Sequence, residues 1–173
     1  MLTATKIRIY PSKEQEVFLY AQFGAVRFCY NKTLHIKRHF YKKRGVSLSP
    51  KKDLKPLLAV AKKTSRYSWL KKYDSVALQQ SVIHLHEAFS KFFDKSLPNR
   101  FPRFKSKRTK QSSYHCMGVK ISEGKIKVPK LDWIKAKVHR DVEGEVKSIT
   151  ISCTSTGKFY ASILTKQEEN NPP

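Results

Sequence analysis

The chain has 173 residues, which is enough for one domain or two small ones. Hydrophobic residues make up 39% of it and aromatic residues 12%, a composition that excludes a disordered chain. The 36 Lys and Arg residues against 13 Asp and Glu residues leave a net charge of +23, so a polyanionic partner is expected.

A strand is the first predicted element, over residues 2–10. Ile7 and Ile9 alternate with Lys6 and Arg8, which is the period of a half-buried strand, and Pro11 ends it. Lys6 and Arg8 on its polar side are candidate nucleic-acid-binding residues.

A helix is predicted from residue 13, because Ser12 and Gln15 form a capping box ahead of apolar residues at helical spacing. Gly24 interrupts that spacing. Residues 13–23 and 25–43 are therefore either two helices that meet at a turn or one bent helix. The first option is the geometry of a helix-turn-helix, and it makes Arg27 and Asn31 on the second helix candidate contacts to DNA. The spacing itself leaves both options open.

Two histidines, His35 and His39, lie four residues apart on this helix, a spacing that is able to place two imidazoles on one metal. No nearby Glu or Cys offers a third ligand, and Lys37 and Arg38 disfavour a cation. We therefore predict no metal site and no cofactor.

Two further helices are predicted before residue 97. Ser49 and Pro50 are suited to the N-cap and the first position of one of them. After a connector over residues 64–73, the other begins at Asp74 or Ser75, and one apolar stripe follows it: Leu78, Val82, Leu85, Phe89 and Phe92. Ser75 and Gln79 lie in its first two turns, where a glutamine is able to bond an adenine edge, although helix glutamines are usually only solvated.

The basic stretch, residues 100–110, interleaves six cations with Phe101 and Phe104. Pro102 prevents the preceding helix from continuing, so a loop or the start of a strand is expected. The guanidinium and ammonium groups suit phosphates, and the two rings suit a base or an anchor in the core. The alternative is a solvated loop pinned by two buried rings. The candidate contacts are Arg100, Arg103, Lys105, Lys107, Arg108 and Lys110.

Extended segments dominate the rest of the chain. Residues 112–121, 125–128, 146–153 and 158–166 are predicted strands, separated by glycine turns at Gly124, Gly144 and Gly157. With the first strand they predict an α+β fold, in which a small antiparallel β-barrel holds a helical insertion after its first strand. The expected divisions are residues 1–11 (first barrel strand), 12–97 (helical insertion), 98–166 (basic stretch and remaining strands) and 167–173 (tail).

Neither the cysteines nor the carboxylates indicate an active site. Cys29, Cys116 and Cys153 are odd in number and contain no CxxC pair, so buried apolar roles are expected. The acidic cluster of Asp141, Glu143 and Glu145 contains Gly144, which favours a solvated loop over metal ligands. The residues alone therefore indicate a binding protein.

Five segments in order resemble the N-terminal half of the TnpB/OrfB proteins of bacterial insertion sequences, and the resemblance covers nearly the whole chain. They are residues 6–11 (KIRIYP), 27–31 (RFCYN), 69–80 (Trp-Leu, then Leu-Gln-Gln), 101–108 (FPRFKSKR) and 127–133 (KVPKLDW). The resemblance implies a wedge-like barrel with a helical recognition insertion, in compact relatives of type V CRISPR nucleases. It also implies a guide RNA from the end of the element and recognition of a short target-adjacent DNA motif.

By position, the resemblance assigns Ser75, Val76 and Gln79 to the part that approaches the target-adjacent motif, and residues 114–116, including Tyr114 and His115, to a second contact. Relatives carry a larger polar or basic residue where this chain has Ser75 and Val76, which leaves the identity of the motif open. The family's RuvC nuclease carboxylates and zinc cysteines would follow Pro173, so the resemblance implies a relative truncated before that domain.

We therefore expect a transposon-encoded, nucleic-acid-binding protein that binds guide-like RNA and DNA and has no nuclease activity of its own. We expect it in the cytoplasm, associated with the nucleoid, and not in a membrane, because the sequence has no apolar run of about 18 residues and no signal-peptide pattern. Two alternatives are a helix-turn-helix DNA-binding protein that acts alone and a structural RNA-binding protein. The sequence does not indicate an oligomeric state.

Overall fold

The computed structural model describes residues 1–107, 111–138 and 144–167. The chain divides into two compact units. The sheet unit comprises Met1–Ala21 and Lys110–Pro173, and the helical unit comprises Gln22–Thr109.

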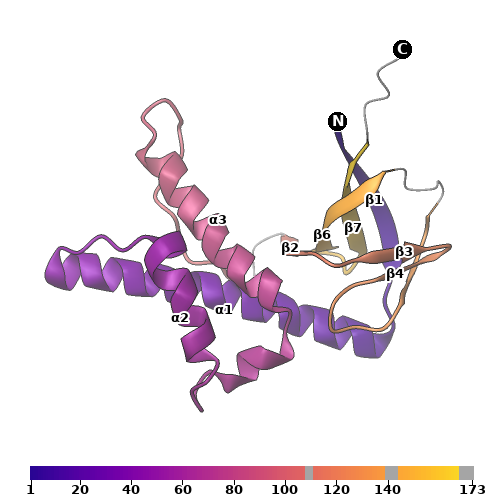
Figure 1. Ribbon diagram of the computed structural model, residues 1–173, viewed down its shortest axis with the longest axis horizontal. Helices are drawn as coiled ribbons and strands as arrows, with labels where there is room; N and C mark the ends of the chain where they lie inside the picture. Colours follow the sequence, from indigo (N-terminus) through magenta and orange to yellow (C-terminus); the bar gives the residue numbers. More distant parts are fainter. Residues whose placement is uncertain (108–110, 139–143, 168–173) are drawn as a thin grey trace. The chain divides into compact units, whose positions relative to one another are not determined.

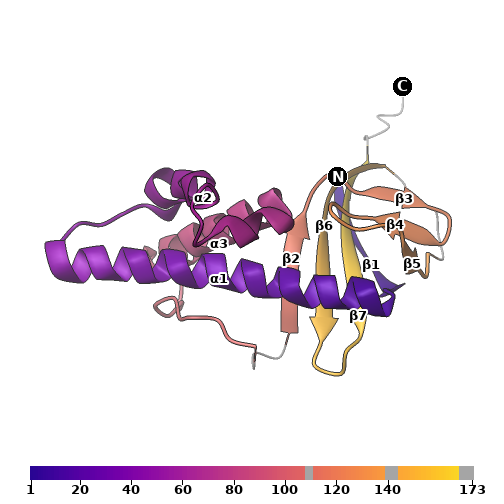
Figure 2. The ribbon, with the colours of Figure 1, turned by 90° about the horizontal axis from the view of Figure 1, so that it is seen from below.

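Within the described residues, the sheet unit contains seven antiparallel strands, whose order in the sheet is β2-β6-β7-β1-β5-β4-β3. The strands are β1 (Leu2–Tyr10), β2 (Gln111–Cys116), β3 (Lys120–Ser122), β4 (Lys125–Lys127), β5 (Ile134–Ala136), β6 (Glu145–Thr154) and β7 (Phe159–Lys166). The first strand of the chain thus lies inside the sheet, between β7 and β5. The short β3 and β4 run across the direction of β6 and β7, so the sheet curls into a half-barrel (Figures 1 and 2).

The predicted α+β class, with an antiparallel sheet and a helix directly after its first strand, is confirmed. Where the sequence predicted one strand over residues 112–121, the structure has β2 and β3 with a break at Met117–Val119. Strand β5 was not predicted, because three residues are too short for alternation to stand out. No pair joins β2 to β3 in the described part of the sheet, which is why it is a half-barrel.

One face of the sheet forms the core of this unit. Ile7, Ile9, Phe159, Ala161 and Ile163 are buried on it, as the alternation of β1 and β7 predicted. The first turns of α1 (Lys13–Arg44) belong to the same unit: the Tyr20 ring meets the Phe159 ring edge-on at 5.5 Å. The other face carries polar and aromatic side chains.

Helix α1 is continuous for 32 residues and passes through Gly24 without a break. Its predicted capping box is present, since Ser12 Oγ accepts the Gln15 N–H at 3.2 Å and Gln15 Oε1 accepts the Ser12 N–H at 2.9 Å. A glycine inside a helix costs about 1 kcal/mol. Burial of the neighbouring Phe23, Ala25 and Val26 offsets this cost, so the second option left by the sequence, a single helix, is the one observed.

The helical unit continues with a π-helical turn η1 (Pro50–Leu54), α2 (Lys55–Ala61), a 3-10 turn η2 (Ser68–Lys72) and α3 (Ser75–Phe93). Ser49 and Asp74 cap η1 and α3, as predicted. Tyr30 and Leu34 of α1 pack with Leu85 and Phe89 of α3, and each buried side chain of this kind stabilises the fold by roughly 1.5–3 kcal/mol.

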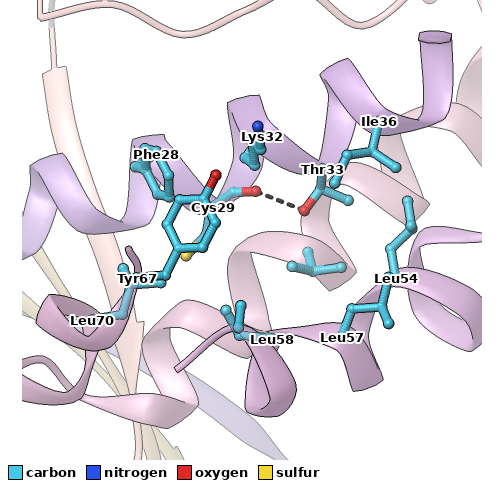
Figure 3. Close-up of a pocket in the computed structure, with 12 residues that line it drawn as sticks. Phe28, Cys29, Lys32, Thr33, Ile36, Leu54, Leu57, Leu58, Tyr67 and Leu70 are labelled. Atoms are coloured by element: carbon cyan, nitrogen blue, oxygen red, sulfur yellow. Dashed lines mark hydrogen bonds between the residues drawn. The ribbon is translucent and has the colours of Figure 1, made fainter. Parts of the chain in front are cut away.

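Helix α2 is less well packed than its neighbours, because none of its residues is buried. Figure 3 shows the apolar crevice of about 100 Å³ beside it, where Phe28, Cys29 and Ile36 of α1 face Leu57 and Leu58 of α2. Thr33 points into the same crevice but donates its hydroxyl to the Cys29 carbonyl oxygen at 2.7 Å, as the dashed line shows. The crevice therefore presents an almost purely apolar lining.

None of the described helices is both long enough and apolar enough to cross a membrane. All three cysteines are buried, as predicted. Burial raises the pKa of the Cys29 thiol to about 12.

Candidate nucleic-acid interface

The basic stretch has no helix or strand over residues 100–107, and a side-chain amide of α1 holds it in place. Asn31 donates from Nδ2 to the Lys105 carbonyl oxygen at 2.8 Å, and its Oδ1 accepts the Lys105 N–H at 2.8 Å. These two hydrogen bonds satisfy both backbone polar groups of Lys105, in a segment without regular secondary structure. Asn31, predicted as a DNA contact, therefore positions the segment that carries the cations.

The cations of this stretch lie at the surface. Arg100, Arg103 and Lys107 are exposed. Lys105 is exposed as a residue, but its ammonium lies 4.2 Å from the centre of the Tyr30 ring, and desolvation of the ammonium lowers its pKa. The remaining two predicted cations, Arg108 and Lys110, lie outside the described residues.

The two phenylalanines of the stretch have different neighbours. Phe101 meets Phe89 and Phe92 of α3 edge-on, each at 5.3 Å between ring centres. The Arg38 guanidinium lies 5.9 Å from the Phe101 ring and 5.6 Å from the Phe104 ring. Phe101 and Phe104 are 42% and 48% exposed, so the two rings are partly open to solvent and are not the buried pins of the alternative interpretation.

In the sheet unit, Lys6 and Arg8 lie on the polar face of β1, opposite Ile7 and Ile9. Lys6 Nζ lies 4.7 Å from the centre of the Tyr160 ring, and the Arg8 guanidinium lies 5.5 Å from the same ring and 5.1 Å from Tyr10. These contacts orient both cations on an aromatic surface. The buried Nε of Arg8 has no hydrogen-bond partner among the described residues.

The two residues assigned on β2 point to opposite faces of the sheet. Tyr114 is 4% exposed and belongs to the core side, opposite Ile151. His115 is half-buried on the other face, where Nδ1 lies 3.5 Å from Thr150 Oγ1. Of the pair, His115 is thus the one that reaches the polar face.

The start of α3 presents both of its predicted residues to solvent, since Ser75 and Gln79 are exposed. Asp74 Oδ1 accepts the Val76 N–H at 3.3 Å, and Gln22 Oε1 of α1 accepts the Asp74 N–H at 3.0 Å. Gln22 and Asp74 are both buried, so the turn that presents Ser75 is anchored on α1.

Arg27 is half-buried on α1, and burial lowers its pKa. The His35 and His39 rings stack with their centres 6.1 Å apart. The part of the chain that the structure describes contains no group of three or more His, Cys, Asp or Glu side chains able to hold a metal. Of the acidic cluster, Asp141 and Glu143 lie outside the described residues, and Glu145 pairs with Lys147 at 3.0 Å.

Sequence reasoning missed Lys37 and Arg38. Lys37 is 9% exposed, and its ammonium donates to the Leu48 carbonyl oxygen at 2.6 Å and lies 4.7 Å from the Phe89 ring centre. Burial lowers its pKa, and Asp53 opposes this change. The sequence signal for an aromatic site was the number of phenylalanines in residues 89–104. That Lys37 and Arg38 lie next to those rings depends on the fold.

Comparison with known proteins connects this arrangement to a family. Residues 1–46, which hold β1 and α1, match the helix-turn-helix domain of the OrfB/IS605 type. In this chain the matched helical part is the single helix α1.

Three curated proteins are similar in sequence. The virulence protein VsdF of Salmonella dublin is 60% identical over 116 residues, which are 64% of this chain and 98% of that protein. The putative RNA-guided DNA endonuclease InsQ of Escherichia coli is 34% identical over 173 residues, 99% of this chain and 42% of InsQ. A putative RNA-guided DNA endonuclease of Streptomyces pristinaespiralis is 33% identical over 168 residues, 93% of this chain and 40% of that protein.

The chain thus spans about two fifths of the length of the two endonuclease relatives that it matches. The match to each of them runs over nearly all of this chain. This chain belongs to the TnpB/OrfB family of transposon-associated proteins, which it matches through a nucleic-acid-binding region of helix-turn-helix type.

Proposed function

We propose that this chain is the nucleic-acid-binding part of a TnpB/OrfB-type protein, and that it binds an RNA from the end of its element together with target-adjacent DNA. One observation carries the proposal: Asn31 fixes the backbone of the basic stretch while Arg100, Arg103 and Lys107 remain exposed. Cations held ready on a fixed backbone suit a polyphosphate, and the net charge of +23 supports the same partner.

The DNA part of the proposal rests on the start of α3. Ser75 and Gln79 are exposed there, on a turn anchored by the buried pair Gln22 and Asp74. A glutamine amide is able to bond the N6 and N7 of adenine in the major groove. The two similar endonucleases are described as RNA-guided and as acting on DNA, which supports two nucleic-acid partners for this chain.

The first experiment is to capture the tagged chain from cells that carry its element and to sequence the bound RNA. Enrichment of RNA from the end of the element supports the proposal. Bound RNA that follows cellular abundance would instead support a structural RNA-binding protein, and specific duplex binding without any RNA would support a DNA-binding protein that acts alone.

A charge-matched pair of variants tests the basic stretch. Replacing Arg100, Arg103 and Lys107 by alanine should make the slope of log Kobs against log salt concentration shallower by roughly 2 to 3. Each lost phosphate contact removes about 0.7 to 0.9 from the magnitude of that slope. The control replaces Lys51, Lys52 and Lys63, which are also exposed cations of the helical unit. Equal effects of the two triple variants would show that only net charge matters.

We also propose that this chain does not cleave nucleic acid by itself. Two-metal hydrolysis of a phosphodiester requires a set of carboxylates around the ions, and the described residues present no such set. The purified chain, incubated with magnesium and supercoiled plasmid, should leave the plasmid intact. Nicking that co-purifies with the chain and disappears with EDTA would contradict this.

A further inference from the structure

A broad groove of about 1010 Å³ lies in the helical unit, between α1, α3 and the basic stretch. Its apolar part consists of five phenylalanines, three from α3 and two from the basic stretch: Phe89, Phe92, Phe93, Phe101 and Phe104. Phe93 is 66% exposed. Phe101 and Phe104 are also more than two fifths exposed, and neighbouring exposed rings of this kind indicate a binding site.

Cations surround these rings. Lys37, Arg38, Lys42 and Lys43 of α1 line the groove, and none of the described residues that line it is acidic. The Lys37 ammonium lies over the Phe89 ring, and the Arg38 guanidinium lies within 6 Å of the centres of both the Phe101 and the Phe104 rings. An apolar peptide needs the rings but gains nothing from the cations, whereas a phosphate-linked chain of bases needs both.

We propose that this groove binds unpaired nucleotides of a single strand, with bases on the exposed phenylalanines and phosphates on Arg38, Lys42 and Lys43. The inference rests on the proposed function and specifies the form of the nucleic acid. A base inside a duplex has both faces stacked, so only a strand with splayed bases is able to use the rings. At about 1010 Å³ the groove lies at the upper end of the roughly 300–1,000 Å³ range of pockets for drug-sized ligands, which leaves room for more than one base.

The test measures binding of a labelled, unstructured single strand, as RNA and as DNA, and of a duplex of the same length, over a range of salt concentrations. Phe93→Ala and Phe104→Ala should each weaken single-strand binding about tenfold, as loss of one stacked base does, with the salt dependence unchanged. Lys42→Ala with Lys43→Ala should instead lower the salt dependence by about 1.4. Duplex binding should hardly respond to either phenylalanine variant.

Two further variants separate stacking from apolar contact and from loss of the fold. Phe93→Trp should keep wild-type affinity, whereas Phe93→Leu, which preserves an apolar side chain, should bind as weakly as Phe93→Ala. Val60→Ala on α2 is the control, because Val60 is 58% exposed and lies outside the groove. Circular dichroism should show all of these variants folded, since the substituted side chains are exposed.

The outcomes distinguish the two proposals. If the wild-type chain binds neither single strand nor duplex in dilute buffer, the proposed function fails. If the wild-type chain binds but the phenylalanine variants bind single strands equally well, the groove proposal fails and the proposed function stands. The same holds if these variants lose affinity for single strands and for duplex to the same extent. Dimers of the wild-type chain that Phe93→Ala abolishes, with unchanged nucleic-acid affinity, would assign the groove to a second copy of the chain. If Phe93→Ala loses more affinity for the RNA single strand than for the DNA single strand, the bound strand is RNA.

Discussion

At the scale of single residues, Asn31 holds the backbone of the basic stretch through two hydrogen bonds to Lys105. Replacing Asn31 by alanine removes two hydrogen bonds to the Lys105 backbone, each worth about 0.5–1.5 kcal/mol. We expect the helical unit to lose about 1–3 kcal/mol of stability and the Lys105 amide to exchange faster. Urea unfolding and hydrogen exchange measure both effects. Asn31→Asp keeps the acceptor oxygen, so its stability should fall between those of the wild type and of Asn31→Ala. If the Lys105 amide exchanges at the same rate in Asn31→Ala as in the wild type, Asn31 does not hold the stretch.

Tyr20 should titrate well above the ordinary pH range of a tyrosine. Its hydrogen bond with Cys153 Sγ at 3.6 Å, with a further effect of burial, raises its pKa to about 12. An unfolded tyrosine has a pKa of about 10, so the stability from this contact is complete below pH 10 and declines as the pH rises toward 12. Spectrophotometric titration of the wild type against Tyr20→Phe isolates this group. Cys153→Ala should shift the titration to lower pH; a Tyr20 signal already complete near pH 10 would contradict the assignment.

Among the described helices, α2 is the one that packs least. It has no buried residue, and Leu57 and Val60 are 50% and 58% exposed. We expect its amides to exchange through local opening, far faster than those of α3, whose Leu85 is fully buried. Hydrogen exchange with mass spectrometry measures this directly. Leu85→Ala should lower the free energy of unfolding by about 2–5 kcal/mol, and Leu57→Ala should lower it much less. Equal exchange protection of α2 and α3 would contradict the weak packing of α2.

At the same scale, local signals in the sequence predicted elements well where they were strong. Ser12 with Gln15, Ser49 with Pro50, and Asp74 mark helix starts that the structure confirms. The pairing of β6 with β7 followed from alternation around Gly157, whose φ of 82° suits glycine. The continuity of α1 through Gly24 was left open, because burial of Phe23 and Ala25 decides it and spacing does not reveal burial.

The candidate site was harder to predict for a related reason. The exposed cations of residues 100–107 followed from composition, but the part played by Asn31 depends on a contact between positions 74 apart in the chain. Tyr114 and His115 differ in burial because register decides which face each one takes. The groove joins rings from two segments to cations from a third, and only tertiary packing brings them together.

For the molecule as a whole, the net charge of +23 should make stability depend on ionic strength. Self-repulsion opposes the compact state, so we expect the melting temperature to rise with added sodium chloride and to rise further with a polyanion at low salt. Differential scanning fluorimetry measures this. Sucrose at matched osmolality provides the uncharged control, and a melting temperature that responds no more to salt than to sucrose would contradict the prediction.

The place of β1 in the sheet has a consequence during synthesis. Strand β1 is made before β5 and β7, yet it pairs with both, and backbone hydrogen bonds join Met1 to Gln167, 166 positions later. The contiguous residues of Gln22–Thr109 have their own partners much earlier. The nascent chain therefore carries β1 as an unpaired strand until residues 134–166 have been made. In this unpaired strand, charged Lys6 and Arg8 alternate with Ile7 and Ile9. Their charges oppose aggregation of the strand until β5 and β7 are made.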